Sequence, residues 1–401
     1  MVTLWSSLRR YDVLVLVAGI WFLAKFLRYA FPPLFEELKL TFEVSNAAVG
    51  TAFTGFMLVY ALMQFPSGLL ADRLGTVRII VGGVLTAALG AIVVVFGGPF
   101  ALLVVAMLVM GAGTGAHKTV AIKLLALVYP ARTGRSLGVF DTVGTFGGVV
   151  APLVIAGLVA SGVDWRVLFV AAAASGAFLG VAVAVRVSGN VPDSEVMASS
   201  KSIPLRAYAQ PFTERRFFVF VVVTLGFSFT YNGVVAFLPL YLVQEVGTST
   251  AVASLLYSVL FAVSVVQLLT GELADRIGRL TVISATLGVA TLSLAFLLAA
   301  PMWNGQVLGV PVLAGLAVVG LGLGSHGFRP VRGVHLAALL PDSLAGGGLG
   351  AVRTALMGAG AVAPAIVGVI ADAVGFQVAF SVLLGSLAVA AVLAVGLLLT
   401  E

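Results

Sequence analysis

Twelve apolar stretches, each long enough to cross a lipid bilayer, divide the chain into six spans, a polar gap and six further spans. A transmembrane helix needs about 20 mostly apolar residues. Because the hydrocarbon layer offers the backbone no water to bond, each span is expected to be a helix that satisfies its own amides and carbonyls. The expected spans are about 12–34, 46–67, 78–97, 100–128, 137–161 and 166–188, then 216–243, 250–270, 280–301, 310–340, 348–371 and 376–400.

Composition agrees with lipid as the surrounding solvent. Hydrophobic residues make up 61% of the 401 residues and charged residues 9%, whereas a soluble domain has about 45–50% and about 25%. A soluble globule and a disordered chain are therefore excluded, and the absence of cysteine excludes a disulfide scaffold. The N-terminal apolar run continues past the hydrophobic region of a signal peptide and meets no small-residue cleavage site, so it is interpreted as the first span.

Basic residues in the connecting segments predict the orientation. With the N-terminus in the cytoplasm, thirteen Lys and Arg residues lie on that side, and only Lys39 and Arg166 lie on the other. By the positive-inside rule, both termini are expected on the cytoplasmic side of the inner (cytoplasmic) membrane. The predicted domains are an N-terminal six-helix bundle (1–188), a cytoplasmic linker (189–215) and a C-terminal six-helix bundle (216–401).

The two halves of the chain repeat one another. GLLADRLGTVR (68–78) after the second span corresponds to GELADRIGRL (271–280) after the eighth, and residues 111–117 of the fourth span correspond to 320–326 of the tenth. Residues 30–35 likewise match 236–241, and 137–152 match 349–364. An even number of spans gives both repeats one orientation, an arrangement found in alternating-access transporters.

Through these two motif copies and the repeat, the sequence resembles the major facilitator superfamily over essentially its whole length. The resemblance implies an all-α membrane protein with 12 transmembrane helices in two pseudo-symmetric six-helix bundles. It also implies secondary transport by alternating access, a cavity lined by spans 1, 4, 7 and 10, and a monomer. Thr76 and Val77 are uncharged where many relatives carry a basic residue, which predicts a weaker latch in the first half.

The motif predicts a latch at the cytoplasmic mouth. Gly68 and Gly271 are expected to allow close approach of helix ends, and Gly75 and Gly278 to supply tight turns. Asp141 and Arg353 occupy matching positions on spans 5 and 11 and are assigned to the same gating network. The predicted gating residues are Gly68, Asp72, Arg73, Gly75, Arg78, Asp141, Gly271, Asp275, Arg276, Gly278, Arg279 and Arg353.

Charged residues inside the predicted spans are nearly all basic. Asp141 is the single acid, against Lys25, Arg28, Lys118, Lys123, Arg329, Arg332 and Arg353. A charge at the centre of a membrane helix costs about 2.5–3.5 kcal/mol on insertion scales, so these side chains should face protein or a wet cavity. A wet cavity lined by cations attracts anions, and arginine offers a carboxylate two parallel hydrogen bonds.

The predicted substrate is therefore a small organic anion, a carboxylate, with the aromatic rings as an apolar wall. The candidate binding residues are Trp21, Lys25, Arg28, Tyr29, His117, Lys118, Tyr231, Asn232, His326 and Arg329. Other interpretations stay open at this stage. Arg28 could pair with Glu36 or Glu37, the histidines could be packed and neutral, and Lys123, Arg332 and His335 could extend toward the membrane surface.

Proton coupling is predicted to use His117 and His326, because histidine titrates near neutral pH; anion exchange without a proton is the alternative. The alternative functions within the superfamily are a drug/proton antiporter, for which acids would be expected on the cavity spans, where none is found, and an inorganic-anion exchanger of the nitrate type. A nitrate-like exchanger would carry Arg on spans 2 and 8, which are uncharged.

The sequence holds no metal cluster, nucleophile constellation or phosphate loop, so no enzyme, cofactor or nucleic-acid partner is expected. The expected partners are the anion, a co-transported proton and the lipid bilayer.

Overall fold

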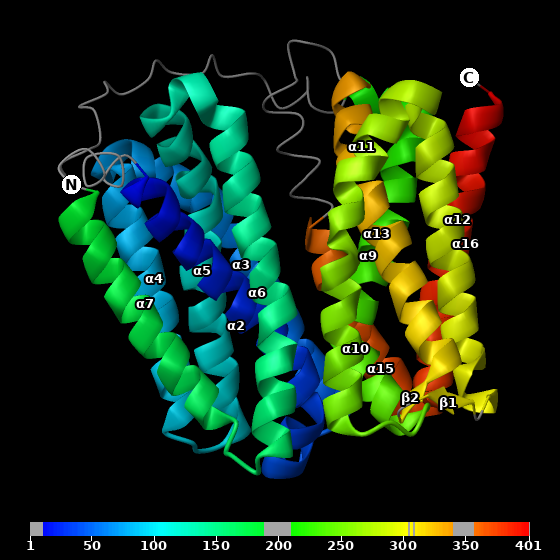
Figure 1. Ribbon diagram of the computed structural model, residues 1–401, viewed down its shortest axis with the longest axis horizontal. Coiled ribbons are helices and arrows are strands. Elements are labelled where there is room, and N and C mark those ends of the chain that lie inside the picture. Colours follow the sequence, from blue (N-terminus) through cyan, green and yellow to red (C-terminus); the bar gives the residue numbers. More distant parts are fainter. Residues whose placement is uncertain (1–10, 188–209, 304, 308, 340–356, 401) are drawn as a thin grey trace. The chain divides into compact units, whose positions relative to one another are not determined.

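The structure is a computed structural model that describes residues 11–187, 210–303, 305–307, 309–339 and 357–400. Within these residues, 12 helical segments are long and apolar enough to cross a membrane, which confirms the predicted helical fold (Figure 1). The helices of the first half are α2 (Asp12–Phe42), α3 (Asn46–Leu74), α4 (Thr76–Val95), α5 (Phe100–Val128), η1 (Pro130–Arg132), α6 (Thr133–Ala160) and α7 (Arg166–Arg186).

The second half contains η2 (Gln210–Thr213), α9 (Arg215–Gln244), α10 (Thr250–Ala262), η3 (Val263–Val265), α11 (Val266–Ile277), α12 (Arg279–Ala299), η4 (Ala300–Met302), α13 (Val312–Ala338), α15 (Ala363–Val374) and α16 (Phe376–Leu399). Two short antiparallel strands, β1 (Gln306–Val307) and β2 (Val310–Pro311), connect α12 to α13. The sequence did not predict these strands, because two-residue strands in a connection are too short to show an alternating pattern.

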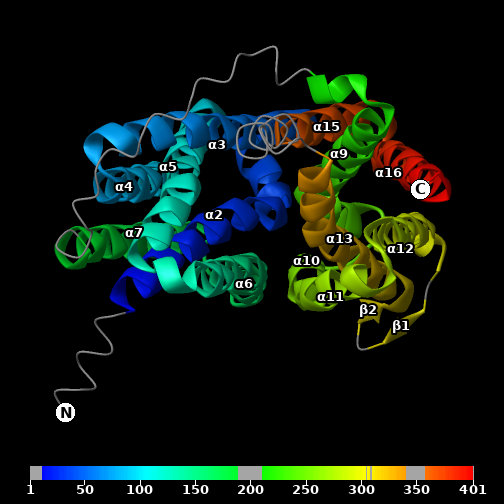
Figure 2. The ribbon, with the colours of Figure 1, turned by 90° about the horizontal axis from the view of Figure 1, so that it is seen from above.

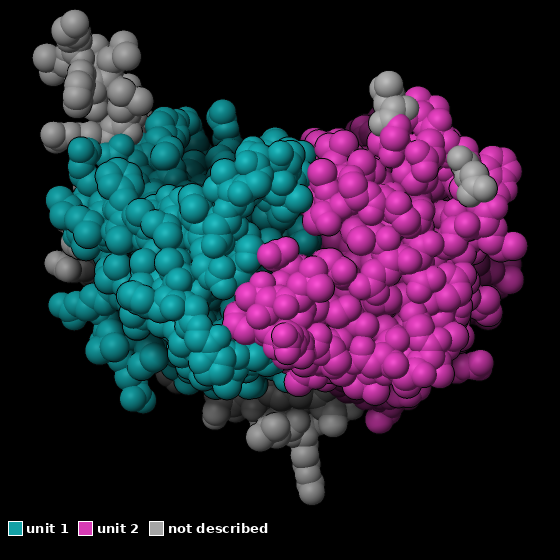
Figure 3. Space-filling model, turned by 90° about the horizontal axis from the view of Figure 1, so that it is seen from below, with its two compact units in different colours: residues 1–34, 55–199 teal, residues 35–54, 200–401 magenta. Residues whose placement is uncertain are grey.

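The chain forms two compact units (Figure 3). The first contains residues 1–34 and 55–199, and the second contains 35–54 and 200–401. The segment 35–54, which contains the end of α2, the connection and the start of α3, thus belongs to the second unit although it precedes most of the first in sequence. The predicted domain limits at 188 and 215 stay predictions, and they differ from these units in that segment.

The third span of each half packs between the fourth and the sixth. In the first unit α4 packs on α5 and α7 (Figure 2), and in the second unit α12 packs on α13 and α16. Gly113 of α5 lies against Gly83 and Ala87 of α4, while Gly111 and Gly115 lie against α3. Because these glycines carry no side chains, they let the backbones of neighbouring helices meet.

Several helices contain prolines in their interior. α2 contains Pro32 and Pro33 yet continues to Phe42, past the end predicted for the first span. A proline has no amide hydrogen, so Pro239 of α9 leaves the Val235 carbonyl without its usual intrahelical donor. The Tyr257 hydroxyl of α10 donates to that carbonyl at 2.8 Å. A side chain from a neighbouring helix thus replaces the lost backbone bond.

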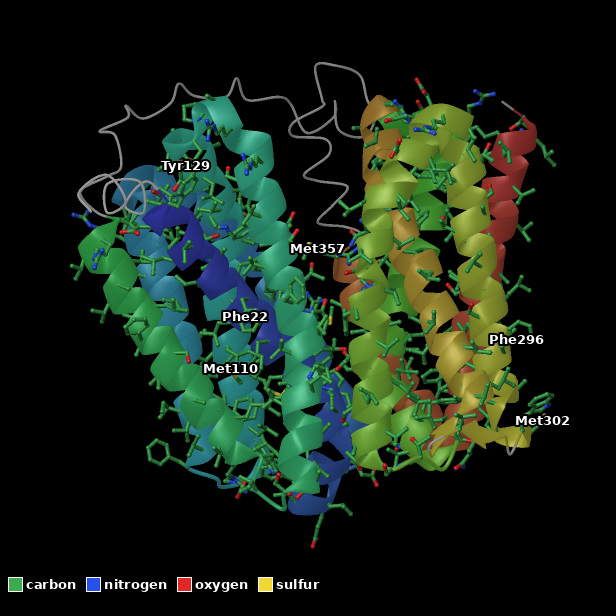
Figure 4. The ribbon with its side chains drawn as sticks, viewed as in Figure 1. Phe22, Met110, Tyr129, Phe296, Met302 and Met357 are labelled. Atoms are coloured by element: carbon green, nitrogen blue, oxygen red, sulfur yellow. The ribbon has the colours of Figure 1, made fainter. Side chains whose placement is uncertain are left out.

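Large apolar side chains cover the outside of the helices. Phe296 of α12 and Met302 of η4 lie at the outer edge of the second unit (Figure 4) and are 55% and 84% exposed. Soluble monomers rarely expose large contiguous apolar patches. Side chains of this kind, together with twelve apolar spans, identify the exterior as a surface for lipid.

Adjacent glycines of α4 provide a test of the packing. A Cβ on Gly83 would meet the Gly113 carbonyl at 2.9 Å, whereas a Cβ on Gly82 has no neighbour within 4 Å. We expect Gly83→Val to destabilise the first unit by about 1–3 kcal/mol through overpacking. Gly82→Val carries the same change of helix propensity and serves as the matched control. Thermal unfolding of the purified protein in detergent measures both; equal midpoints would contradict the close contact.

Candidate functional site

Trp21 of α2 is held rigidly at the centre of an aromatic group in the first unit. Its side chain is 2% exposed. Phe140 of α6 stacks on the indole, with 5.6 Å between ring centres and 13° between planes. Gly144, one turn further along α6, makes room for the indole, because a Cβ at that position would overlap the ring. The indole therefore has one fixed position against α6.

Two lysines from different helices lie over this ring. The Lys25 ammonium of α2 is 5.3 Å from the centre of Trp21 and 5.3 Å from that of Tyr29. The Lys118 ammonium of α5 is 4.9 Å from the centre of Trp21. Cations within about 6 Å of an aromatic face are attracted by the quadrupole of the ring. The rings of Trp21 and Tyr29 thus bring together lysines that lie on separate helices.

Arg28 extends the group on the same helix. Its guanidinium carbon is 5.6 Å from the centre of Tyr29 and 5.3 Å from that of Tyr60, and its Nη2 lies 3.8 Å from the sulfur of Met57. Tyr60 and Met57 of α3 were not predicted. Helical spacing identifies neighbours on α2 itself, but it does not show which residues of α3 face them.

We call Trp21, Lys25, Arg28, Tyr29 and Lys118 the first cation cluster. Its three basic side chains are half-buried and its two rings are buried. At an effective dielectric of about 20, two unit charges about 10 Å apart repel each other by about 1.7 kcal/mol. The rings of Trp21 and Tyr29 therefore hold three basic side chains from two membrane-spanning helices in one group.

His117 of α5 lies behind the cluster. Its side chain is 0% exposed, its Nε2 is 3.2 Å from the Val17 carbonyl, and its ring is 6.3 Å from Trp21 and 6.0 Å from Phe140. Nδ1 has no hydrogen-bond partner among the described residues. The ring of His117 therefore contacts the indole of Trp21 and the α2 backbone rather than solvent.

The second unit contains a corresponding group with a single arginine above a tyrosine. The guanidinium carbon of Arg329 on α13 is 5.6 Å from the centre of Tyr231 on α9. Tyr231 stacks with Phe227 at 5.8 Å and meets His326 edge-on at 5.9 Å. We call Phe227, Tyr231, His326 and Arg329 the second cation cluster. His326 is 1% exposed, so both histidines of the repeat are enclosed by aromatic rings.

Asn232 follows Tyr231 on α9 and packs against the eleventh span. Its side-chain amide donates to the Ser228 carbonyl of its own helix at 2.8 Å. Gly360 of the eleventh span is so close that a Cβ there would collide with Asn232 and Ser228. The predicted binding role of Asn232 stays a prediction.

The predicted gating motifs form the turns that their glycines require. Gly75 and Gly278 have φ angles of 91° and 96° and precede α4 and α12. Such positive angles carry no steric cost for glycine. The close approach expected at Gly271 stays a prediction, since no described residue comes within 4 Å of its Cβ position. The nearest atom to that position on Gly68 is 4.0 Å away.

Charged groups of the motifs form local ion pairs. Asp72 pairs with Lys123 of α5, and Arg276 pairs with Glu272 one turn earlier on α11 at 2.5 Å. The first pair gives Lys123 a role that the sequence interpretation did not assign. Arg353 lies outside the described residues, so its predicted part in the gating network stays a prediction, as do the gating roles of Asp141, Arg73, Arg78, Asp275 and Arg279.

Asp372 at the end of α15 is a functional candidate that the sequence reading missed. Its carboxylate accepts hydrogen bonds from the amides of Asn46 at 3.0 Å and Ala47 at 2.7 Å. These are the first two amides of α3, which have no partner within their own helix. The eleventh span was predicted to end at 371, so Asp372 was counted as a loop residue.

A sequence signal for this site exists. Residues 371–375 read Ala-Asp-x-x-Gly, as do 71–75 and 274–278 in the two recognised motifs. Gly375 has a φ of 92° and precedes α16, just as Gly75 and Gly278 precede their helices. The chain therefore contains a third copy of this helix–turn–helix junction, and its aspartate caps another helix.

The contact between α3 and α15 is reciprocal. The Thr54 hydroxyl oxygen of α3 accepts a hydrogen bond from the Ala365 amide near the start of α15 at 3.0 Å. Gly50 lies directly against the Pro364 carbonyl, and Gly368 against the Asn46 carbonyl. These contacts hold segment 35–54 in the second unit.

Substituting Asp372 tests the cap. We expect Asp372→Ala to lower the free energy of unfolding by about 0.5–2 kcal/mol, the usual effect of deleting an N-cap side chain. Asp372→Asn keeps one acceptor oxygen and should lose less. The unfolding midpoint of the purified protein is the measurement, and an unchanged midpoint in Asp372→Ala would show that the cap contributes nothing.

Comparison with known proteins supports the class that the fold defines, a multi-pass membrane transporter. The sequence profile described as Major Facilitator Superfamily matches residues 17–326. The chain belongs to the major facilitator superfamily, whose members are transporters rather than enzymes. Among curated proteins none matches the chain.

Solved transporter structures share the fold at low sequence identity. A bacterial homologue of the human lysosomal transporter Spinster has 18% identity and a TM-score of 0.80, covering 98% of this chain and 97% of its own. The nucleoside transporter NupG has 14% identity and a TM-score of 0.80, covering 96% and 99%. A POT family transporter in complex with 5-aminolevulinic acid has 14% identity and a TM-score of 0.77, covering 96% and 95%.

Proposed function

We propose that this transporter moves a small organic anion bearing a carboxylate across the cytoplasmic membrane by alternating access. The observation that carries the proposal is the first cation cluster. Lys25, Arg28 and Lys118 gather on two buried rings within membrane-spanning helices. Basic side chains inside a membrane are costly and are found mainly where they act on substrates or ions.

The second cation cluster supports the same cargo class. Arg329 lies over Tyr231 and Lys25 lies over Trp21, so each unit presents a cation on an aromatic face, although the repeat does not equate these pairs of residues. Arginine adds two parallel hydrogen bonds to a carboxylate. Among the other predicted binding residues, Tyr29 lies beneath Lys25 and Arg28, and His117 and His326 contact the rings of Trp21 and Tyr231.

The proposal includes proton symport through the two buried histidines. His117 and His326 occupy the same place in the repeat. His117 contacts Trp21 and His326 contacts Tyr231, the rings over which the cations of their clusters lie. The proposal also places both termini in the cytoplasm, on the distribution of basic residues between the connecting segments. The protein acts as a monomer with the bilayer as its surroundings.

Removing the charge of Lys25 tests the cargo class. We expect Lys25→Gln to reduce carboxylate uptake into proteoliposomes by about tenfold or more, because one charged contact within the membrane is lost. Lys39→Gln, on the same helix but outside the cluster, is the matched control and should retain uptake. Uptake of cations but of no anions by the wild type would end the proposal.

Coupling is tested by the pH dependence of uptake. A proton symporter takes up its anion faster when the outside is more acidic than the inside. We expect His117→Gln and His326→Gln, alone or together, to remove this dependence, because glutamine does not titrate. If the double variant keeps the wild-type pH dependence, the proton is carried elsewhere or the protein exchanges anions.

A further inference from the structure

We infer that the connection between α12 and α13, which contains η4, β1 and β2, is an interfacial anchor that lies in the headgroup region of the bilayer. The inference goes beyond the proposed function and does not depend on it, because it concerns one surface of the second unit. Its starting point is that three large apolar side chains of this connection, Met302, Trp303 and Val307, point outward. Trp303 is 66% exposed and Val307 is 61% exposed.

The internal repeat shows that this connection is longer than the fold requires. α4 and α5, the counterparts of α12 and α13 in the first half, are joined by residues 96–99 alone, whereas residues 300–311 join α12 to α13. The offset between matching positions is 203 residues at the motif before these helices and 209 residues in the span after the connection. The second half therefore contains six additional residues here that joining the two helices does not explain.

The connection also carries no charge. No Asp, Glu, Lys or Arg occurs from residue 281 to residue 328, a stretch that includes the whole connection. The connections after α2, α6 and α9, which the order of the spans places at the same end, contain Glu43, Asp164 and Glu245. The short connection after α4 is uncharged as well, and it exposes Phe96. An uncharged segment with exposed apolar side chains is suited to contact with lipid rather than with water alone.

The exposed side chains continue the lipid-facing surface of α12. Leu292 and Phe296 are exposed one turn apart on that helix, and Met302 lies on the same outer edge of the second unit (Figure 4). Figures 1 and 2 both show β1 and β2 at this outer edge, beside the ends of α12 and α13. The apolar surface thus passes from the helix into the connection, and this continuity identifies the bilayer as the partner.

The connection is an ordered element that is attached to α13. β1 and β2 pair as antiparallel strands, and the Val312 amide donates to the Gly305 carbonyl at 3.0 Å. Val310 of β2 lies against α13, because a Cβ on Gly315 would be 3.7 Å from its Cγ1 atom. Val307, which pairs with Val310, stays exposed. The hairpin therefore holds its outward apolar side chains in a fixed place at the end of the helices.

Polar groups of the hairpin limit how deeply it can enter the bilayer. A sheet of two strands has two edges with amides and carbonyls that need other partners, and the Gln306 side chain is exposed. Hydrocarbon cannot bond such groups, whereas the headgroup region contains water and polar atoms. The Trp303 indole combines an apolar ring with one N–H donor, which is the chemistry that places tryptophan at membrane interfaces. The boundary between headgroups and acyl chains suits all of these groups.

Spin labelling of the full chain in liposomes of phosphatidylethanolamine and phosphatidylglycerol tests the inference. The chain contains no cysteine, so Trp303→Cys and Val307→Cys each provide a single labelling position in the hairpin connection. Phe296→Cys is the control for the lipid-facing helix, and Ser161→Cys, in the connection after α6, is the control for water. Collision rates of each label with oxygen, which concentrates in lipid, and with a water-soluble nickel complex report its depth.

We expect the labels at positions 303 and 307 to lie about 5–10 Å into the boundary between headgroups and acyl chains, as interfacial segments do. The label at position 161 should be more accessible to the nickel complex, and the label at position 296 less accessible. Thermal unfolding of each variant shows that it is folded, and the two hairpin positions are independent, so a folding defect in one leaves the other as the test.

Three results would overturn the inference. Nickel accessibility at positions 303 and 307 equal to that at position 161 would place the hairpin in water. Low accessibility to both reagents would show that protein covers it. Spin–spin broadening that disappears on dilution with unlabelled protein would show that a second copy of the chain is the partner. None of these results bears on anion uptake, so the proposed function is tested separately.

Discussion

Inside a bilayer no water is present to bond an exposed amide or carbonyl, and this constraint shapes the whole molecule. Helices satisfy most backbone groups, and side chains from neighbouring helices satisfy those that the helices release. Tyr257 donates to the carbonyl freed by Pro239, and Asp372 accepts from the first amides of α3. Charges are costly in hydrocarbon as well, and four basic side chains of the spans, Lys25, Arg28, Lys118 and Arg329, lie on aromatic rings.

The spans, the repeat and the glycine turns could be predicted from the sequence, because each depends on local composition or spacing. The contacts between distant segments could not be predicted from it. Asp372 meets Asn46 only after two helices from opposite ends of the chain have packed, and Asn232 bonds its own helix because Gly360 approaches it. The length of α2 was underestimated because Pro32 and Pro33, which usually end helices, lie within it.

The two cation clusters show how a duplicated architecture has diverged in chemistry. Trp21 corresponds to Phe227 and His117 to His326, so ring and histidine persist in both units. The charges do not follow the symmetry, since the first cluster has three cations and the second has Arg329. The aromatic framework therefore belongs to the repeat, whereas the arrangement of charge is particular to each half and is where specificity is expected to reside.

The mutual capping of α3 and α15 has a consequence for how freely segment 35–54 can leave its place. Separation would expose two amides and an aspartate at once, together with the Ala365 amide that Thr54 now satisfies. Water at the membrane boundary can replace those bonds, but hydrocarbon cannot. Segment 35–54 can therefore separate from α15 only where water reaches these groups. The rate of separation should depend on how readily solvent reaches the α3–α15 junction.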